Sequence, residues 1–178
     1  MSIRFPQEAH LRDERKLMIR PFTEADVDAL WEFVERLPRD IRRFSWEDFG
    51  HRETVVEWAR DLDYDKAVPL LAVDGTKVVG EARLVYRDGG PLRLVGYVQW
   101  MLDPEYRGAG LGTLLVNNFV TMARDSGLKH LTCMLIKDHE EDAIKTLRRL
   151  GFDQHELPQY GVDPDGNQKD MVKMILEL

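Results

Sequence analysis

A short glycine-rich run, Arg107-Gly108-Ala109-Gly110-Leu111-Gly112, offers the clearest chemistry in this 178-residue sequence. It follows an apolar run at residues 98–102 and opens a segment with helical apolar spacing at residues 114–126, so we expect a turn from a strand into a helix. The first N–H groups of a helix lack partners and carry the positive end of its dipole, and glycines let an anion approach the backbone. Arg107 adds a planar cationic donor. The run therefore predicts a phosphate site.

Two nucleotide-binding motifs do not fit this run. A P-loop needs Gly, four residues, then Gly-Lys-Ser/Thr, and no lysine follows Gly110 or Gly112. The dinucleotide fingerprint is G-x-G-x-x-G, whereas the spacing here is G-x-G-x-G. A helix-start turn without a ligand is the alternative at this point.

The composition is that of a globular protein and narrows its partners. Hydrophobic residues make up 43% of the chain, charged residues make up 32%, and the formal net charge is -7. The broad basic surface of a nucleic-acid-binding protein is therefore absent, and a phosphate site has to be local. The length predicts a single folded domain at residues 17–178, after an N-terminal extension at residues 1–16. That extension is too charged for a signal peptide and no apolar run could span a bilayer, so we expect a cytoplasmic protein.

Histidine and cysteine give little sign of metal or nucleophilic chemistry. The five histidines show no metal-ligand spacing, so we expect no bound metal. The single cysteine, Cys133, lies in a strand-like apolar segment without an activating neighbour. We expect it to be a small buried core residue.

The first third of the chain predicts one strand and two helices. The strand is expected at residues 17–22, and Thr23 is a candidate N-cap for a helix that runs to about Leu37. A second helix is expected at residues 51–62. The intervening residues 39–53, rich in arginine and aromatic side chains, are consistent with a plain loop and with a substrate-facing segment.

The rest of the chain predicts a mixed sheet with two further helices. The expected strands lie at residues 67–73, 76–86, 91–102, 130–135, 152–157 and 169–176. The first three form an antiparallel meander, with a hairpin turn at Asp74-Gly75. A helix at residues 110–126 crosses over to the fourth, which should lie parallel to the third. With a helix at residues 138–150 and a turn-rich segment at residues 160–167, the fold class is α+β with a mostly antiparallel sheet.

The glycine-rich run resembles the acetyl-CoA pyrophosphate loop of the GCN5-related N-acetyltransferases (GNAT), whose pattern is Gln or Arg, two residues, Gly, one residue, Gly or Ala. Residues 143–152 are similar to the family's Ala-Ile-x-Leu-Tyr-x-x-x-Gly-Phe block. The predicted order β-α-α-β-β-β-α-β-α-β-β is also the family's, so the resemblance covers nearly all of residues 17–178. It implies that acetyl-CoA binds where two parallel strands splay apart.

The resemblance also implies two sets of cofactor contacts. Backbone groups at the end of the strand would hold the pantetheine arm, and the loop amides with Arg107 would hold the pyrophosphate. Glu140 occupies a position where the family often has asparagine. The implied cofactor-binding residues are Trp100, Met101, Leu102, Arg107, Gly108, Ala109, Gly110, Leu111, Gly112, Thr113 and Glu140.

The chain departs from the family where an acid and a base are expected. Leu147 replaces the tyrosine that protonates the thiol, and a Glu that serves as base in bacterial protein lysine acetyltransferases corresponds to Tyr97. Glu81, on the adjacent predicted strand, is the nearest acidic candidate, with a solvated strand residue or a partner of Arg83 as the alternatives. Glu81 and Tyr97 are therefore the candidate catalytic residues.

The sequence thus predicts an N-acetyltransferase that transfers acetyl from acetyl-CoA to a primary amine of a small molecule or a protein lysine. Because the family's tyrosine and glutamate are missing, the alternative is a weak or inactive acyl-CoA-binding sensor. The net charge of -7 favours a cationic acceptor. Neither nucleic acid nor membrane is expected as a partner, and pairing of the final strand offers a route to a homodimer.

Overall fold

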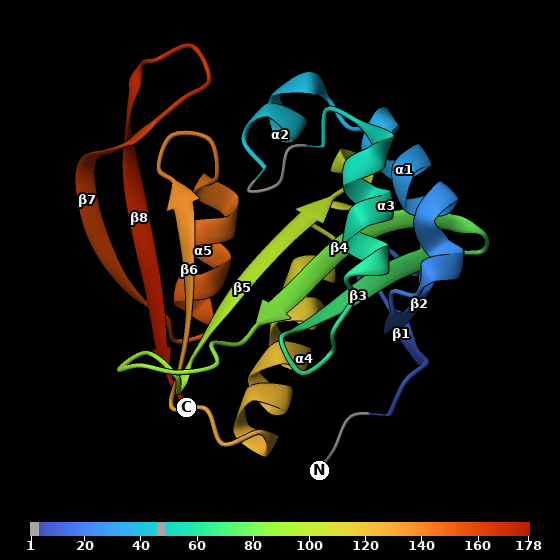
Figure 1. The fold of residues 1–178 in the computed structure, drawn as a ribbon, viewed down its shortest axis with the longest axis horizontal. Coiled ribbons are helices and arrows are strands. Elements are labelled where there is room, and N and C mark those ends of the chain that lie inside the picture. The colour runs from blue at the N-terminus through green and yellow to red at the C-terminus, as the bar shows by residue number, and fades with distance from the viewer. Residues whose placement is uncertain (1–3, 46–48) are drawn as a thin grey trace. The chain divides into compact units, whose positions relative to one another are not determined.

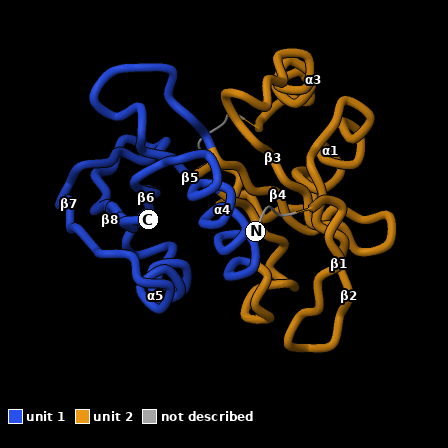
Figure 2. The backbone as a smooth tube through the Cα atoms, turned by 90° about the horizontal axis from the view of Figure 1, so that it is seen from below, with its two compact units in different colours: residues 1–3, 85–99, 112–178 blue, residues 4–84, 100–111 orange. Residues whose placement is uncertain are grey.

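The structure is a computed structural model that describes residues 4–45 and 49–178. The chain divides into two compact units, which Figure 2 shows in different colours. Of the described residues, unit 1 contains residues 85–99 and 112–178, and unit 2 contains residues 4–84 and 100–111. No described helix combines the length and apolarity that a membrane crossing requires.

Unit 2 joins the N-terminal strands to the first helices (Figure 1). Its elements are β1 (Gln7–His10), β2 (Lys16–Pro21), η1 (Glu24–Asp26), α1 (Val27–Arg36), α2 (Arg39–Arg43), α3 (Arg52–Arg60), β3 (Ala67–Asp74), most of β4 (Lys77–Val85) and η2 (Pro104–Tyr106). Hydrogen-bonded strands follow the order β1-β2-β3-β4, with antiparallel pairing of β1 with β2 and of β2 with β3.

A compact apolar core holds the helices of unit 2 in place. Leu30, Phe33 and Val34 recur at spacings of three and one along α1 and are fully buried. Phe22 stacks on Trp58 of α3 with ring centroids 4.8 Å apart. The predicted cap is also present, because the Asp26 carboxylate accepts hydrogen bonds from the Thr23 backbone and hydroxyl, both at 2.9 Å. The helix predicted from Thr23 to about Leu37 is therefore present as η1 followed by α1, which ends at Arg36.

Unit 1 contains the parallel strand pair that the sequence predicts. Its elements are the start of β5 (Val95–Leu102), nearly all of α4 (Leu111–Asp125), β6 (His130–Ile136), α5 (Glu141–Arg149), β7 (Asp153–Val162) and β8 (Gln168–Glu177). The strand order is β5-β6-β8-β7; β5 and β6 are parallel, whereas β6 with β8 and β8 with β7 are antiparallel. The α+β class with a mixed, mostly antiparallel sheet is confirmed.

Several predicted boundaries were wrong. β5 begins at Val95 rather than at residue 91, because residues 90–95 fold into turns in which Arg93 donates to Gly90 and Val95 donates to Leu92. β7 continues to Val162, past an irregularity in its pairing with β8. Neither β1 nor the short helix α2 was predicted, since four or five residues with mixed polarity carry no clear period.

The final strand cannot offer the predicted route to a dimer. β8 pairs with β6 along one side and with β7 along the other, so both rows of its backbone groups are occupied. The edge of this part of the sheet is β7 instead.

Candidate functional site

The glycine-rich run forms a turn between η2 and α4 whose backbone requires glycine. Gly108 has φ +74° and Gly110 has φ +98°, a region that side chains with a Cβ rarely adopt. α4 begins at Leu111, directly after the second of these glycines. Arg107 and Gly108 are exposed. The local structure is thus the predicted turn into a helix, with the first amides of a 15-residue helix at its end. That this turn binds an anion stays a prediction.

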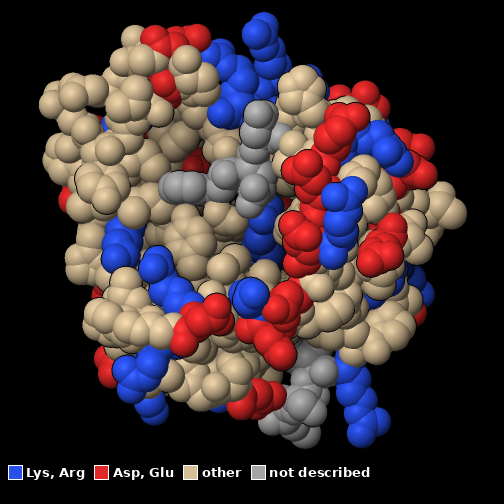
Figure 3. Space-filling model, in the orientation of Figure 1, with Lys and Arg blue, Asp and Glu red and all other residues tan. Residues whose placement is uncertain are grey.

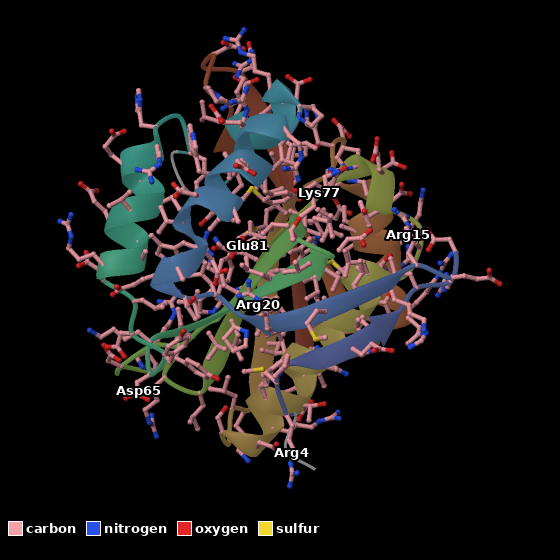
Figure 4. The ribbon with its side chains drawn as sticks, turned by 90° about the vertical axis from the view of Figure 1, so that its right-hand side faces the viewer. Arg4, Arg15, Arg20, Asp65, Lys77 and Glu81 are labelled. Atoms are coloured by element: carbon pink, nitrogen blue, oxygen red, sulfur yellow. The ribbon has the colours of Figure 1, made fainter. Side chains whose placement is uncertain are left out.

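Neighbouring segments of unit 2 anchor the chain just before this turn. Tyr106 is buried and donates its hydroxyl to Asp74 on β3 at 2.6 Å. Burial, and next the hydrogen bond to Asp74, raise the pKa of Tyr106. The Arg15 guanidinium lies 3.9 Å from the centre of the Tyr106 ring, and the Lys77 ammonium lies 5.8 Å from it. Both cations are labelled in Figure 4. Asp103 fixes the start of η2 by accepting a hydrogen bond from the Glu105 backbone.

Within unit 1, the parallel pairing of β5 with β6 stops early. The two strands pair over only three residues, and Tyr97↔Thr132 is the last pair. β6 nevertheless continues to Ile136, and its pairing with β8 continues as far as Ile136↔Met171. From Met134 onward, the β6 edge that faces β5 therefore has no registered strand partner. We call this part of unit 1 the β5–β6 opening.

Two side chains hydrogen-bond to the backbone of β6 at this opening. The backbone N–H of Lys137 donates to the carbonyl of Asp170 in β8. Successive N–H groups of a strand point to opposite sides, so those of Met134 and Ile136 point away from β8. The Ile136 N–H donates to the Glu140 carboxylate at 2.6 Å, and the backbone of Met134 hydrogen-bonds to the phenol of Tyr97. Tyr97 and Glu140, two of the predicted site residues, thus both contact the backbone of β6 at this opening.

Tyr97 is held in its neutral form. Its pKa is raised to about 12, chiefly by burial and also by the nearby Cys133 and Glu140, against the opposing effect of hydrogen bonds with Gln99 and the Met134 backbone. Near neutral pH the phenol therefore keeps its proton. It can donate a hydrogen bond, but in this state it cannot take a proton from an amine.

Cys133 lies next to this tyrosine and is a core residue, as predicted. Its side chain is buried, and burial, followed by the charge of Glu140, raises the pKa of its thiol far above the ordinary value. A thiol in this state is not a nucleophile near neutral pH.

Glu81 forms a buried ion pair in the middle of β4. It is 1% exposed, and its carboxylate lies 3.4 Å from Nε of Arg83, which is 5% exposed. Arg83 also lies 4.6 Å from the ring centre of Trp58. Figure 4 labels Glu81 among the strands near the middle of the view. Of the two alternatives to a catalytic role, the solvated strand residue is therefore wrong and the partner of Arg83 is confirmed. The catalytic role of Glu81 stays a prediction.

The remaining predicted positions vary in what they expose. The Met101 side chain belongs to the core cluster of unit 2, so only its backbone could serve a ligand, whereas Trp100 and Leu102 are partly exposed. Leu147 is buried in α5 at the position of the family's tyrosine. Tyr160 lies in β7, not in the turn-rich segment predicted at residues 160–167, and is 68% exposed. Among the described residues, no group of three or more acidic, histidine or cysteine side chains could hold a metal.

Sequence reasoning missed two features of these regions. Arg12 and Arg15 lie in the predicted N-terminal extension. Arg12 contacts the glycine turn, and Arg15 contacts the segment before it. Their spacing in the sequence does not predict these contacts, because the contacts join distant parts of the chain. The Gln99–Tyr97 hydrogen bond was also missed. Its signal was available, since residues two apart on a strand share a face.

Comparisons with known proteins point to one family. Residues 31–152, more than half of the chain, match the Acetyltransferase (GNAT) family. A glucosamine 6-phosphate N-acetyltransferase from Trypanosoma brucei brucei is 34% identical over 85 residues, which are 45% of this chain and 54% of that protein. The chain therefore spans only about half the length of that relative.

Solved structures share the whole fold. The ribosomal-protein-S5-alanine acetyltransferase from Vibrio fischeri superposes with a TM-score of 0.80 at 21% identity, covering 99% of this chain and 96% of that one. The ribosomal L7/L12 alpha-N-protein acetyltransferase RimL, solved in complex with coenzyme A, gives 0.77 at 16% identity, covering 91% of this chain and 94% of that one. At these identities the likeness shows the fold alone.

Proposed function

This chain belongs to the GNAT family of acetyltransferases, and on that premise we propose that it transfers the acetyl group of acetyl-CoA to a primary amine of a small molecule or a protein lysine. The observation that carries the proposal is the end of the β5–β6 pairing at Tyr97↔Thr132. A gap between parallel strands leaves backbone groups without strand partners, and an extended ligand can pair with them. The glycine turn that follows β5 along the chain would bind the phosphate groups of acetyl-CoA.

We assign the cofactor contacts to backbone groups and one cation. The amides of residues 108–113 and the Arg107 guanidinium would hold the pyrophosphate, and the backbone of residues 100–102 would pair with the pantetheine arm. We also assign Glu140 to the cofactor-binding residues; its carboxylate accepts the Ile136 N–H at the β5–β6 opening. An asparagine at this position could both donate and accept hydrogen bonds, whereas the carboxylate of Glu140 can only accept them.

The chemistry divides between a base and a hydrogen-bond donor. The neutral amine attacks the thioester carbonyl carbon, the C–S bond breaks, and CoA leaves as the thiolate. Glu81 would take the proton released by the amine, through water because its carboxylate is buried. Tyr97 would donate a hydrogen bond to the developing negative charge, which its protonated phenol allows.

The acceptor is best matched by a cation. Acidic side chains gather over α1 and α3 on the face seen in Figure 3. The exposed acidic residues of these two helices are Asp28, Glu32, Glu35, Glu53 and Glu57, of which Asp28 pairs with Arg52. Such a field raises the rate at which a positively charged amine arrives, and falls with ionic strength. We therefore favour a polyamine or a lysine-containing peptide over an anionic amine. The cytoplasm and a homodimer stay predictions.

One experiment tests the proposal directly. Titration with acetyl-CoA in a calorimeter measures binding, and release of CoA thiol with a panel of polyamines, amino sugars and lysine peptides measures turnover. We expect binding and turnover with at least one cationic amine. Absence of acetyl-CoA binding would refute the proposal, and binding without turnover on the whole panel would favour the sensor.

A further inference from the structure

The turn between β1 and β2 lies against the glycine turn. The backbone N–H of Arg12 donates to the carbonyl of Ala109 at 3.0 Å. Leu11 buries its side chain, and its N–H donates to the Arg15 carbonyl at 2.9 Å, which closes the β1–β2 turn. The N-terminal segment is thus fixed to the proposed phosphate loop by backbone contacts within unit 2.

The side chain of Arg12 follows the backbone of that loop. A Cβ placed on Gly110 would lie 3.6 Å from Nε of Arg12 and 3.7 Å from its Cγ. Gly110 is the residue with φ +98° that directly precedes α4. The guanidinium therefore lies beside the glycine whose conformation opens the loop amides to an anion.

The two arginines of the β1–β2 turn are used differently. Arg15 forms an ion pair with Asp13, donates to the Glu105 carbonyl at 2.9 Å and covers the ring of Tyr106. Arg15 thus compensates the charge of Asp13 and holds the chain before the loop. Arg12 is exposed, and within residues 4–45 and 49–178 it has no carboxylate at ion-pair distance. A cation beside an anion-binding turn is available for a ligand.

We propose that Arg12 is a second cation of the cofactor's phosphate site and contacts a phosphate group of bound acetyl-CoA, so that the β1–β2 turn belongs to that site. The inference rests on the proposed function. Arg107 approaches from the loop itself, and Arg12 approaches from a strand turn some hundred residues earlier in the chain. Guanidinium groups match phosphate oxygens in geometry and charge. CoA offers two such groups, the pyrophosphate and the 3′-phosphate.

The test measures binding of CoA and of dephospho-CoA, which lacks the 3′-phosphate, to Arg12→Ala, Arg12→Lys and the wild type. Arg60→Ala, an exposed arginine in the last turn of α3, is the matched control for loss of one charge. We expect Arg12→Ala to weaken CoA binding about tenfold at low salt, Arg12→Lys to weaken it less, and Arg60→Ala to leave it unchanged. Thermal unfolding of each variant checks the fold.

The ligand pair locates the phosphate. An equal loss for both ligands assigns Arg12 to the pyrophosphate, and a loss seen with CoA alone assigns it to the 3′-phosphate; either result supports the inference. Wild-type affinity in a folded Arg12→Ala variant overturns it, as does an equal loss in Arg60→Ala. Failure of the wild type to bind CoA at all would instead refute the proposed function.

Discussion

The glycine turn and the two candidate catalytic residues show opposite ways of building a site. The turn uses backbone amides and exposed cations, and two glycines at positive φ set its shape. Glu81 is a buried side chain paired with Arg83. Tyr97 is a partly exposed side chain that hydrogen-bonds with Gln99 and the Met134 backbone. Changes in the turn should therefore alter cofactor affinity and leave the fold intact. Changes at Glu81 or Tyr97 should alter turnover, and at Glu81 also stability.

The largest effect is expected from Glu81→Gln. If Glu81 is the base, kcat should fall about 100-fold near neutral pH while acetyl-CoA affinity is kept. Because the substitution leaves the Arg83 cation buried without its carboxylate, the free energy of unfolding should also fall by about 3 kcal/mol. Steady-state kinetics and chemical denaturation measure the two effects separately.

A second substitution separates catalysis from stability at this pair. In Glu81→Gln/Arg83→Met the unpaired cation is removed, so stability should recover toward that of the wild type. Turnover should stay low. Recovery of turnover together with stability would show that Glu81 only stabilises the fold, and would remove it from the mechanism.

Arg107→Glu tests the exposed side of the comparison. A carboxylate beside the pyrophosphate should weaken acetyl-CoA binding about 30-fold, by loss of a charge-assisted contact and by repulsion. The effect should shrink as salt is raised, and Arg107→Lys should lose much less. The unfolding midpoint should stay unchanged, because Arg107 is exposed. Unchanged affinity for acetyl-CoA would disprove the assigned role.

Gly110→Ala tests whether backbone conformation shapes the turn. A Cβ would find ordinary contact distances there, so the cost comes from φ +98° and should reach about 1 kcal/mol of stability. We expect acetyl-CoA affinity to fall about fivefold as the loop amides shift. Gly89→Ala is the matched control, since its Cβ would meet no atom within 4 Å and its φ is not positive. Equal affinities in both variants would contradict this account.

The same division explains what could be predicted from the sequence. The glycine turn was placed correctly because its signal is local: two glycines, a following apolar period and a helix start lie within a few residues. The cap at Thr23 was found for the same reason, although it caps the 3₁₀ turn η1 that directly precedes α1. The parallel β5–β6 pair followed from the crossover helix between them.

The rest depended on contacts between distant segments. Burial of Glu81 in an ion pair could not be read from β4, whose polar residues at positions 81 and 83 looked like a solvated face. The approach of Arg12 to Ala109 joins segments almost a hundred residues apart. Strand ends were misplaced where Pro91 and the turns after it interrupt pairing, because a proline lacks the N–H that a strand ladder needs.

Tyr97→Phe should give the smallest effect and completes the comparison. With a pKa of about 12, the phenol stays protonated between pH 6 and 9, so it contributes no limb to the pH–rate profile in that range. Removing its hydroxyl should lower kcat about threefold through one lost hydrogen bond, with the profile's shape unchanged. Since the folded pKa lies above the unfolded value of 10, the tyrosine's contribution to stability is complete below pH 10 and is lost as pH rises through 12. In an absorbance titration, folded Tyr97→Phe should therefore show one fewer phenol that titrates at high pH than the wild type. If the wild-type pH profile of kcat had a step near pH 7 that this variant lacked, the assignment of Tyr97 as a hydrogen-bond donor would be contradicted.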